Sequence, residues 1–366
     1  MHPKVKPALR RAWRNLQCVQ FGATPAHAVM LAPVDTTTGS LLGLFDGTRG
    51  IPSLREEARA LGLPDGRLEA LLARLEEAGL LDDAAVGAPG VDALRREDGA
   101  LEQLRADLAS LSVVHREPGG AIGRLAARRS MRVQVRGAGR VGASVAALLS
   151  ASGVGRVEVL DGGRVEPWDV APGGLPAEAV GERRDVAARR LVGRPAEREP
   201  GLSLVVVAPR DGLAAYAPDP VPADDWVVTG TPHLYAGVVE ATGVVGPLVL
   251  PGGTACARCV ELERADLDPA WPRMLAQWRS GRQRTPPPCD LGLATAVAGL
   301  AAAHALAFLD GELPASTGAR WEASLPLLDW CAERIAPHPD CACGAAGRRE
   351  GVRTSAVVTG QDTMTG

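Results

Sequence analysis

Residues 131–161 carry the clearest succession of apolar and polar segments in the chain. A short apolar run containing Val133 and Val135 predicts a buried strand, and the Ala- and Leu-rich stretch that follows predicts a helix. A second apolar run contains Val157 and Val159 and ends in Asp161. The pattern predicts a strand, a turn, a helix and a second strand, the unit from which parallel α/β sheets are built.

Three glycines occupy the predicted turn, at Gly137, Gly139 and Gly142. In a nucleotide-binding unit such glycines permit a tight turn, a close approach of the backbone to phosphate, and close packing of helix on strand. The helix N-terminus offers free N–H groups to an anion. Asp161 ends the second strand, where an acid accepts hydrogen bonds from ribose hydroxyls. The pattern predicts nucleotide binding; the alternative is an α/β unit whose glycines serve packing alone.

Further apolar segments extend this α/β domain over residues 131–345. Residues 202–208 read as a buried strand, and residues 226–230 and 236–240 read as two more. The longest apolar run, at 293–309, is Ala-rich and contains His304. It falls short of a membrane span, so we expect a buried helix.

The first 90 residues predict a smaller α+β domain. Short apolar runs at 19–21 and 28–31 suggest a β-ribbon, and a helix ending near an Asp46-Gly47 turn follows. A second short helical pattern spans 54–61, and leucines at helical spacing mark a third helix, before Gly79: Leu68, Leu71, Leu72 and Leu75. Three helices with a ribbon predict a winged-helix-like module. Its third helix is of mixed charge, which argues against DNA binding.

A helical linker is predicted for residues 91–130. Leucines at 94, 101, 104, 108 and 111 suggest one long helix that bridges the domains or forms a dimer contact, and we expect a homodimer. The tail, residues 346–366, is rich in Thr, Ser and Gly and is expected to be disordered.

Composition narrows the function classes. A net charge of −3 gives no reason to expect nucleic-acid binding, and the basic N-terminus lacks the apolar region of a signal peptide. We therefore expect a cytoplasmic protein without a membrane partner. Lysine occurs only at Lys4 and Lys6, which excludes a P-loop or Schiff-base lysine in a folded core. Asparagine occurs only at Asn15, which excludes a catalytic Asn in the nucleotide domain.

Four of the seven cysteines form two close pairs, Cys256 with Cys259 and Cys341 with Cys343. Two such pairs from distant parts of a chain can be joined through one tetrahedral Zn²⁺. A four-thiolate site has no open position, so the predicted zinc is structural. His338 is an alternative ligand, and unligated reduced thiols are the alternative reading. Cys289 is a weaker candidate, as a thioester-forming nucleophile.

The nucleotide unit, the link Gly153-Val-Gly155-Arg-Val157 and the paired cysteines resemble the ThiF/MoeB-type, ubiquitin-activating-enzyme-like family over about residues 121–344. The resemblance implies that ATP adenylates the carboxylate of a peptide or small protein. It implies phosphates at Gly137, Gly139 and Gly142 and the ribose at Asp161. Arg184 would stand for a phosphate-contacting Lys, and Asp211 would hold Mg²⁺.

The chain departs from the family after its second strand. The family has an Asn-Leu-x-Arg-Gln segment there, whereas this chain has Trp168-Asp-Val-Ala-Pro172-Gly-Gly. The Arg that stabilises the transferring phosphates is therefore missing from this loop. Arg124, Arg128 and Arg129, just ahead of the fold, are candidates to replace it.

The N-terminal module resembles the PqqD-type peptide-recognition domain, which pairs a leader peptide with the edge of its β-ribbon. A PqqD-like module ahead of a ThiF-like domain resembles the leader-binding proteins of azoline-forming pathways, in which a separate YcaO-type enzyme uses the ATP. Three hypotheses follow: an adenylyltransferase, a degenerate scaffold that presents a leader peptide to a YcaO-type cyclodehydratase, and, least supported, a dinucleotide oxidoreductase.

Overall fold

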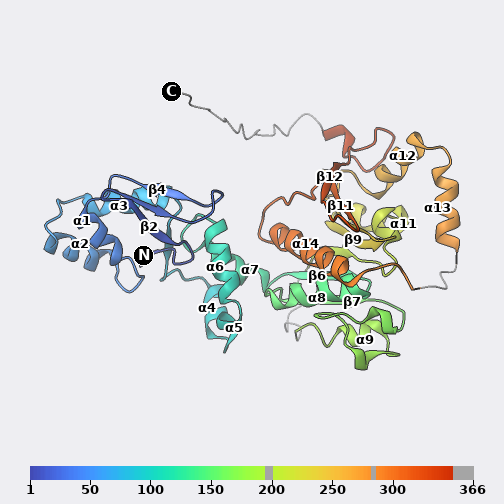
Figure 1. Cartoon of the computed structure of the whole chain (residues 1–366), viewed down its shortest axis with the longest axis horizontal. Coiled ribbons are helices and arrows are strands. Elements are labelled where there is room, and N and C mark those ends of the chain that lie inside the picture. The colour runs from blue at the N-terminus through green and yellow to red at the C-terminus, as the bar shows by residue number, and fades with distance from the viewer. Residues whose placement is uncertain (194–200, 282–285, 349–366) are drawn as a thin grey trace. The chain divides into compact units, whose positions relative to one another are not determined.

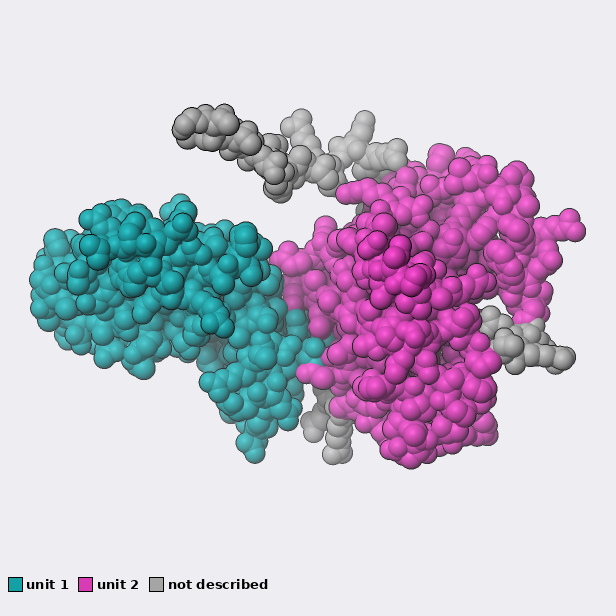
Figure 2. All heavy atoms as spheres, viewed as in Figure 1, with its two compact units in different colours: residues 1–131, 152–155 teal, residues 132–151, 156–366 magenta. Residues whose placement is uncertain are grey.

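The computed structural model describes residues 1–193, 201–281 and 286–348, and the chain forms two compact units (Figure 2). Unit 1 contains residues 1–131 and 152–155, and unit 2 contains residues 132–151 and 156–366. The finer division of unit 1 at residue 90 stays a prediction. Most of the tail expected to be disordered, from residue 349 on, lies outside the described residues.

Unit 1 begins with the expected ribbon and helices (Figure 1). Strands β2 (Arg11–Asn15), β3 (Cys18–Phe21) and β4 (Val29–Leu31) form an antiparallel sheet in that order. Helices α1 (Thr36–Gly43), α2 (Ile51–Ala60) and α3 (Arg67–Glu77) follow, and all three contribute to one buried cluster with β3. Strand β5 (Leu81–Asp83) pairs with β1 (Pro3–Val5), so the N-terminus is also part of this module.

The predicted long helix in the linker is wrong. The chain instead forms α4 (Pro89–Arg96), α5 (Ala100–Gln103), α6 (Arg105–Val114) and α7 (Gly120–Arg128). Helix α4 ends before Glu97, whose backbone is extended, and Gly99 precedes α5 in a left-handed conformation, with φ +71°. Leu94, Leu104 and Leu111 still share one buried cluster, so the leucine spacing marks a common core rather than a continuous helix.

Lys6 corrects another expectation. Its side chain is 1% exposed in unit 1, and Nζ donates hydrogen bonds to the carbonyl oxygens of His115 (2.8 Å) and Arg116 (3.2 Å). Burial lowers the pKa of this ammonium against the opposing effect of nearby carboxylates such as Asp82. A folded core does therefore contain a lysine, although it lies outside the nucleotide domain.

Unit 2 is built on a seven-stranded sheet in the order β12-β11-β10-β9-β8-β6-β7. Strands β6 (Arg132–Arg136), β7 (Arg156–Leu160), β8 (Leu202–Val207) and β9 (His233–Val239) pair in parallel. Strands β10 (Thr242–Val249), β11 (Ala319–Ser324) and β12 (Cys331–Arg334) continue the sheet in antiparallel pairing. The predicted Rossmann-like α/β class is confirmed.

Helices cover this sheet. In chain order they are α8 (Arg140–Ala151), α9 (Arg184–Ala188), α10 (Leu213–Tyr216), α11 (Pro220–Val228), α12 (Ala257–Leu267), α13 (Trp271–Ser280) and α14 (Leu291–Leu309). The short 3-10 helices are η1 (Pro167–Asp169), η2 (Ala177–Ala179) and η3 (Ala346–Arg348).

The strand predicted at 226–230 is wrong, because Trp226 lies in α11. Asp219 caps this helix by accepting a hydrogen bond from the N–H of Val221, and Pro220 occupies its first position. Trp226 shares a buried cluster with Val205 of β8, whereas Val228 is 86% exposed, so one face of the helix is buried.

Helix α14 is long and apolar enough to cross a membrane by length and composition. It packs against α8, β9 and β10, and buries a stripe of small residues that includes Ala294, Ala298 and Ala301 (Figure 1). The predicted helix is confirmed, and one face of it is buried while other positions are exposed.

Candidate functional site

The turn between β6 and α8 is held tightly by its glycines. Gly137 has φ +108°, and a Cβ added there would overlap the carbonyl oxygen of Ala208. A Cβ on Gly142 would overlap the carbonyl oxygen of Gly137. At Gly139 a Cβ would lie 3.1 Å from Cγ of Arg210. The structure thus requires Gly137 and Gly142 for the backbone itself, while Gly139 keeps space beside Arg210.

This turn lies at the point where the order of strands reverses. The chain runs from β6 to β7 on one side and returns to β8 on the other side of β6. Ligands of open α/β sheets bind at such switch points, beyond the carboxyl ends of the strands. The N-terminus of the 12-residue helix α8 begins here, and its first N–H groups have no partners within the helix.

Asp161 lies beside the turn, as its place at the end of β7 predicts. Its carboxylate accepts hydrogen bonds from the N–H groups of Ala138 and Gly163, both at 2.8 Å, and pairs with Nη2 of Arg184 at 3.0 Å. Burial acts to raise the pKa of Asp161, but the hydrogen bonds from Arg184, Gly163 and Ala138 outweigh it and hold the pKa below its ordinary value. Asp161 is therefore charged and fully engaged in this structure.

Arg184 connects two acids. It pairs with Asp161, contacts Asp169 at 3.4 Å, and donates to the carbonyl oxygen of Arg164 at 2.6 Å. A Cβ on Gly163 would overlap its guanidinium, so glycine there leaves room for this side chain. Burial acts to lower the pKa of Arg184, but its carboxylate partners raise it overall, so a cation is fixed beside the turn.

The sequence reasoning missed Asp169 and Arg210. Asp169, at the end of η1, is 2% exposed and accepts a hydrogen bond from the N–H of Glu166. Nε of Arg210 donates to its Oδ1 at 2.6 Å, and the Arg210 guanidinium lies 5.7 Å from the centre of the Trp168 ring. Arg210 lies in the segment after β8, and an Arg next to the predicted Mg²⁺ ligand Asp211 was a signal available in the sequence.

Asp211 is the predicted Mg²⁺ ligand, and it follows Arg210 at the same edge of the sheet. One of its carboxylate oxygens accepts a hydrogen bond from the N–H of Leu213 at 3.2 Å. The side chain lines a pocket of about 590 Å³ whose walls include Tyr216, Trp271 and Glu240. An acid that lines a pocket can hold a cation, and this role stays a prediction.

The three arginines proposed to replace the missing cation lie in unit 1. Arg128 is buried and donates to the carbonyl oxygen of Ser152, Arg129 pairs with Glu97, and Arg124 pairs with Glu117. Each guanidinium already has a partner within its own unit. Their predicted role toward a nucleotide stays a prediction.

The four paired cysteines meet in unit 2, where Cys256 and Cys259 at the start of α12 face the segment that carries Cys341 and Cys343. The four sulfur atoms lie within 4.8 Å of one another. Sγ–Sγ distances are 3.6 Å for Cys256–Cys341 and for Cys259–Cys343, and 3.9 Å for Cys256–Cys259. Four thiolates about 2.3 Å from a tetrahedral zinc lie about 3.8 Å apart, so these residues fit Zn²⁺.

The two other candidates for this chemistry, His338 and Cys289, have other partners. Nε2 of His338 is 2.9 Å from Asp266, and its Nδ1 is 3.1 Å from the N–H of Asp340, so both ring nitrogens have partners. The carbonyl oxygen of Cys289 accepts a hydrogen bond from Arg140. Burial raises the pKa of the Cys289 thiol, which disfavours the thiolate that a nucleophile needs.

Comparisons with known proteins agree with this fold. The model of the ThiF family matches residues 116–199. No curated protein matches the chain.

Solved structures extend the match in three dimensions. The microcin C7 biosynthetic enzyme MccB in complex with N-formylated MccA is 15% identical, with a TM-score of 0.66 over 94% of this chain and 100% of that one. E. coli MccB with ATP is 15% identical, with a TM-score of 0.65 over 94% and 99% of the two chains. PaaA is 16% identical, with a TM-score of 0.64 over 90% and 99%. At this identity the likeness to solved structures establishes the fold, and the ThiF family match extends over residues 116–199.

Proposed function

We propose that the chain is an ATP-dependent adenylyltransferase that activates the carboxylate of a peptide or small protein. The observation that carries the proposal is the position of the Gly137–Gly142 turn. It lies at the switch point of the sheet and is joined to Asp161 through the N–H of Ala138. The likeness to MccB, a biosynthetic enzyme solved with ATP and with the peptide MccA, supports the same class.

In the proposed reaction a carboxylate oxygen of the peptide attacks the α-phosphorus of ATP. The new C–O–P linkage forms as the bond between the α-phosphorus and its bridging oxygen breaks, and pyrophosphate leaves. Backbone N–H groups at the start of α8 bind the phosphates, and Asp161 accepts hydrogen bonds from the ribose. Asp211 would hold Mg²⁺, which screens the phosphate charge when bound.

Arg184 and Asp161 have opposite tasks in this scheme and pair with each other without nucleotide. Arg184 would turn to the phosphates and Asp161 to the ribose, so ATP binding separates the pair. The pair lies at 3.0 Å and is largely shielded from water. Separation has a cost that the nucleotide must offset, which predicts modest affinity for ATP.

The test is ATP-dependent exchange of labelled pyrophosphate, together with calorimetric titration of ATP. Arg184→Gln should weaken ATP binding at least about tenfold, the loss expected for a charge-assisted phosphate contact. Arg183→Gln is the matched control, because the neighbouring Arg183 is exposed and pairs only with Asp185 among described residues. Equal affinities in both variants would refute the assigned phosphate site.

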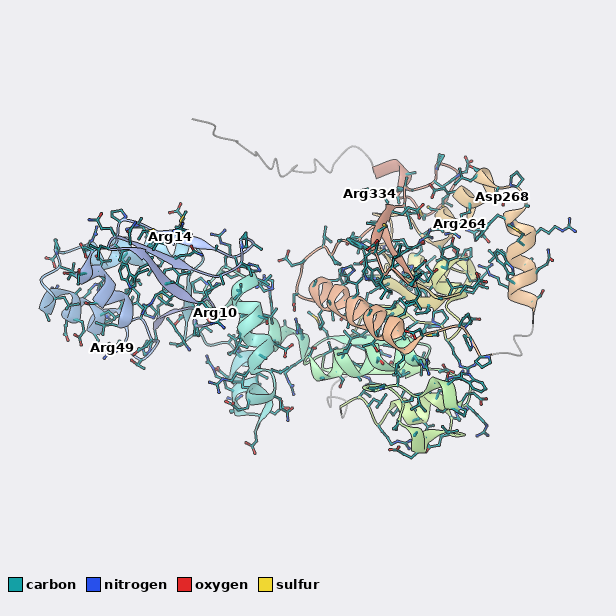
Figure 3. All side chains as sticks on the ribbon, viewed as in Figure 1. Arg10, Arg14, Arg49, Arg264, Asp268 and Arg334 are labelled. Carbon is teal, nitrogen blue, oxygen red and sulfur yellow. The ribbon has the colours of Figure 1, made fainter. Side chains whose placement is uncertain are left out.

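Peptide capture is proposed for unit 1. Strand β2 is an edge of its sheet and is exposed along its whole length. Arg11 and Arg14 of the strand and Arg10 just before it give this edge positive charge; Figure 3 labels Arg10 and Arg14. Trp13 of the same strand is 48% exposed. An extended peptide can add to such an edge as a further strand. The positive charge favours a leader segment rich in Asp and Glu, and the exposed Trp13 ring favours an apolar residue that packs against it.

Fluorescence polarisation with the full chain tests this surface. A labelled peptide of Asp, Glu and Leu should bind, and a peptide with Lys and Arg in place of the acids should not. Arg14→Glu should weaken binding of the acidic peptide severalfold. Arg59→Glu on α2 is the matched control, since Arg59 is an exposed arginine of the same module. Unchanged binding by Arg14→Glu would remove β2 as the site.

The scaffold function is the second candidate, and one observation favours it. Both acids of the site, Asp161 and Asp169, are already satisfied by arginines and backbone N–H groups. With both acids engaged by protein groups, neither is free to accept a hydrogen bond from a nucleotide. Peptide binding without detectable ATP binding at millimolar nucleotide would establish the scaffold, with a YcaO-type enzyme as the partner that uses ATP.

A further inference from the structure

Arg210 is positioned over the phosphate-binding turn by the fold itself. It follows β8 at the switch point, and both its Cα and its Cγ lie close to Gly139, where a Cβ would approach them within 3.2 Å and 3.1 Å. No side chain at position 139 separates the turn from this arginine. Any anion bound by the turn would therefore lie beside Arg210.

The side chain of Arg210 is fixed in place at one end. Nε donates to Oδ1 of the buried Asp169 at 2.6 Å, and the guanidinium lies against the Trp168 ring at 5.7 Å. The second oxygen of Asp169 takes Arg184 and the N–H of Glu166. Asp169 thus joins two cations, and Arg184 has a second carboxylate partner in Asp161, so Asp169 is the carboxylate that holds Arg210.

The other end of the guanidinium lacks an acceptor. Nη2 of Arg210 is buried and has no hydrogen-bond partner among the described residues, and the same is true of Nε in Arg184 and in Arg140, the first residue of α8. Buried charged donors without an acceptor are costly, and each requires an explanation. Because Arg210 borders Gly139 of the glycine turn, its unpartnered Nη2 points to an anion that the protein itself does not supply.

We propose that Arg210 contacts the phosphates of the nucleotide and stabilises the leaving pyrophosphate. The inference rests on the proposed function and deepens it, since it names the cation that residues 169–174 lack. Arg210 reaches the site from the strand β8 side, whereas the sequence directed attention to that loop and to Arg124, Arg128 and Arg129. A guanidinium prearranged by Asp169 and Trp168 needs little reorganisation when charge develops on the leaving oxygen.

The experiment titrates pyrophosphate alone and ATP alone into the full chain by calorimetry, and measures ATP–pyrophosphate exchange. Arg210→Gln should lower pyrophosphate affinity at least about tenfold and exchange by about 100-fold or more, the loss expected for one prearranged donor. Arg210→Lys should recover part of the exchange, because it restores the charge without the fork of donors. Arg183→Gln should behave as the wild type.

The outcomes separate the two proposals. Pyrophosphate binding that is absent in the wild type, or equal in wild type and Arg210→Gln, overturns the role of Arg210 even if exchange is found. Pyrophosphate binding that depends on Arg210, without exchange, upholds the contact and overturns adenylation. Because Asp169 loses a partner in Arg210→Gln, circular dichroism is recorded for each variant. If Arg210→Gln does not fold, the comparison of Arg210→Lys with the wild type decides by the same criteria.

Discussion

Replacement of Cys341 by serine tests the zinc site. We expect one Zn²⁺ per chain, held by Cys256, Cys259, Cys341 and Cys343, because their sulfur atoms already lie at tetrahedral spacing. Cys341 is buried and 3.6 Å from Cys256, from which it is 85 residues distant in sequence. Cys341→Ser removes one of the four ligands and with it the cross-link.

The expected loss follows from the length of chain that the site closes. A cross-link across 85 residues restricts the unfolded chain by about 4.5 kcal/mol on the chain-entropy model. For a unit of this size each kcal/mol changes the melting temperature by roughly 2–4 °C. The variant should therefore melt roughly 9–18 °C lower, and an excess of chelator should bring the wild type toward the same value.

Metal analysis and scanning calorimetry are the assays. Cys331→Ser is the matched control, because Cys331 is an exposed cysteine on β12 outside the cluster, and it should leave both metal content and melting temperature unchanged. A wild type with less than about 0.3 equivalents of zinc, together with an unchanged melting temperature in Cys341→Ser, would refute the site.

Three further predictions concern the α/β domain. Gly137→Ala should lower the free energy of unfolding in urea by about 3 kcal/mol or more, because the residue has φ +108° and an added Cβ would overlap Ala208. Gly173→Ala is the control: Gly173 has φ +72° but open space around it, so the loss should be only about 1 kcal/mol. Burial lowers the pKa of His233 to about 4, so the folded state binds fewer protons than the unfolded state below pH 6.5. The free energy of unfolding should therefore fall by roughly 3 kcal/mol from pH 6.5 to pH 4. An equal fall in His233→Gln would contradict this assignment. The pKa of Asp161 is held below 3.8 in the folded state, so its carboxylate stabilises the fold fully above pH 3.8 and loses this effect as the pH falls through the folded-state pKa. The difference in free energy of unfolding between wild type and Asp161→Asn should close over that pH range. A constant difference would show that the charge of Asp161 does not cause the stabilisation.

Local patterns predicted the elements that local forces determine. The strand, turn and helix around Gly137 follow from apolar spacing and from backbone conformations that only glycine adopts readily. The cysteine pairs could be recognised from the sequence because the two cysteines within each pair are close together. The ribbon and helices of unit 1 were predicted for the same reason.

Contacts between residues far apart in the sequence could not be predicted from local patterns. Arg210 and Asp169 are 41 residues apart, and only the pairing of β8 beside β6 brings them together. The apolar run at Trp226 suits a strand or a helix equally, and the capping by Asp219 and Pro220 decided for the helix. Gly99 was the overlooked signal in the linker, since leucine spacing alone cannot distinguish a long helix from short helices around one core.

The four residues that unit 1 takes from the middle of the chain affect how this protein can be divided. Gly155 donates its N–H to the carbonyl oxygen of Arg128, and a Cβ there would overlap the carbonyl oxygen of Arg129. Gly153 lies against Leu104, and Ser152 accepts from Arg128. A fragment that ends at residue 131 would lack residues 152–155, so Leu104, Arg128 and Arg129 would lose these contacts. The two units therefore cannot be exchanged between related proteins by a single cut at residue 131. A chimaera that keeps the fold would have to take the loop after α8 and residues 1–131 from the same parent.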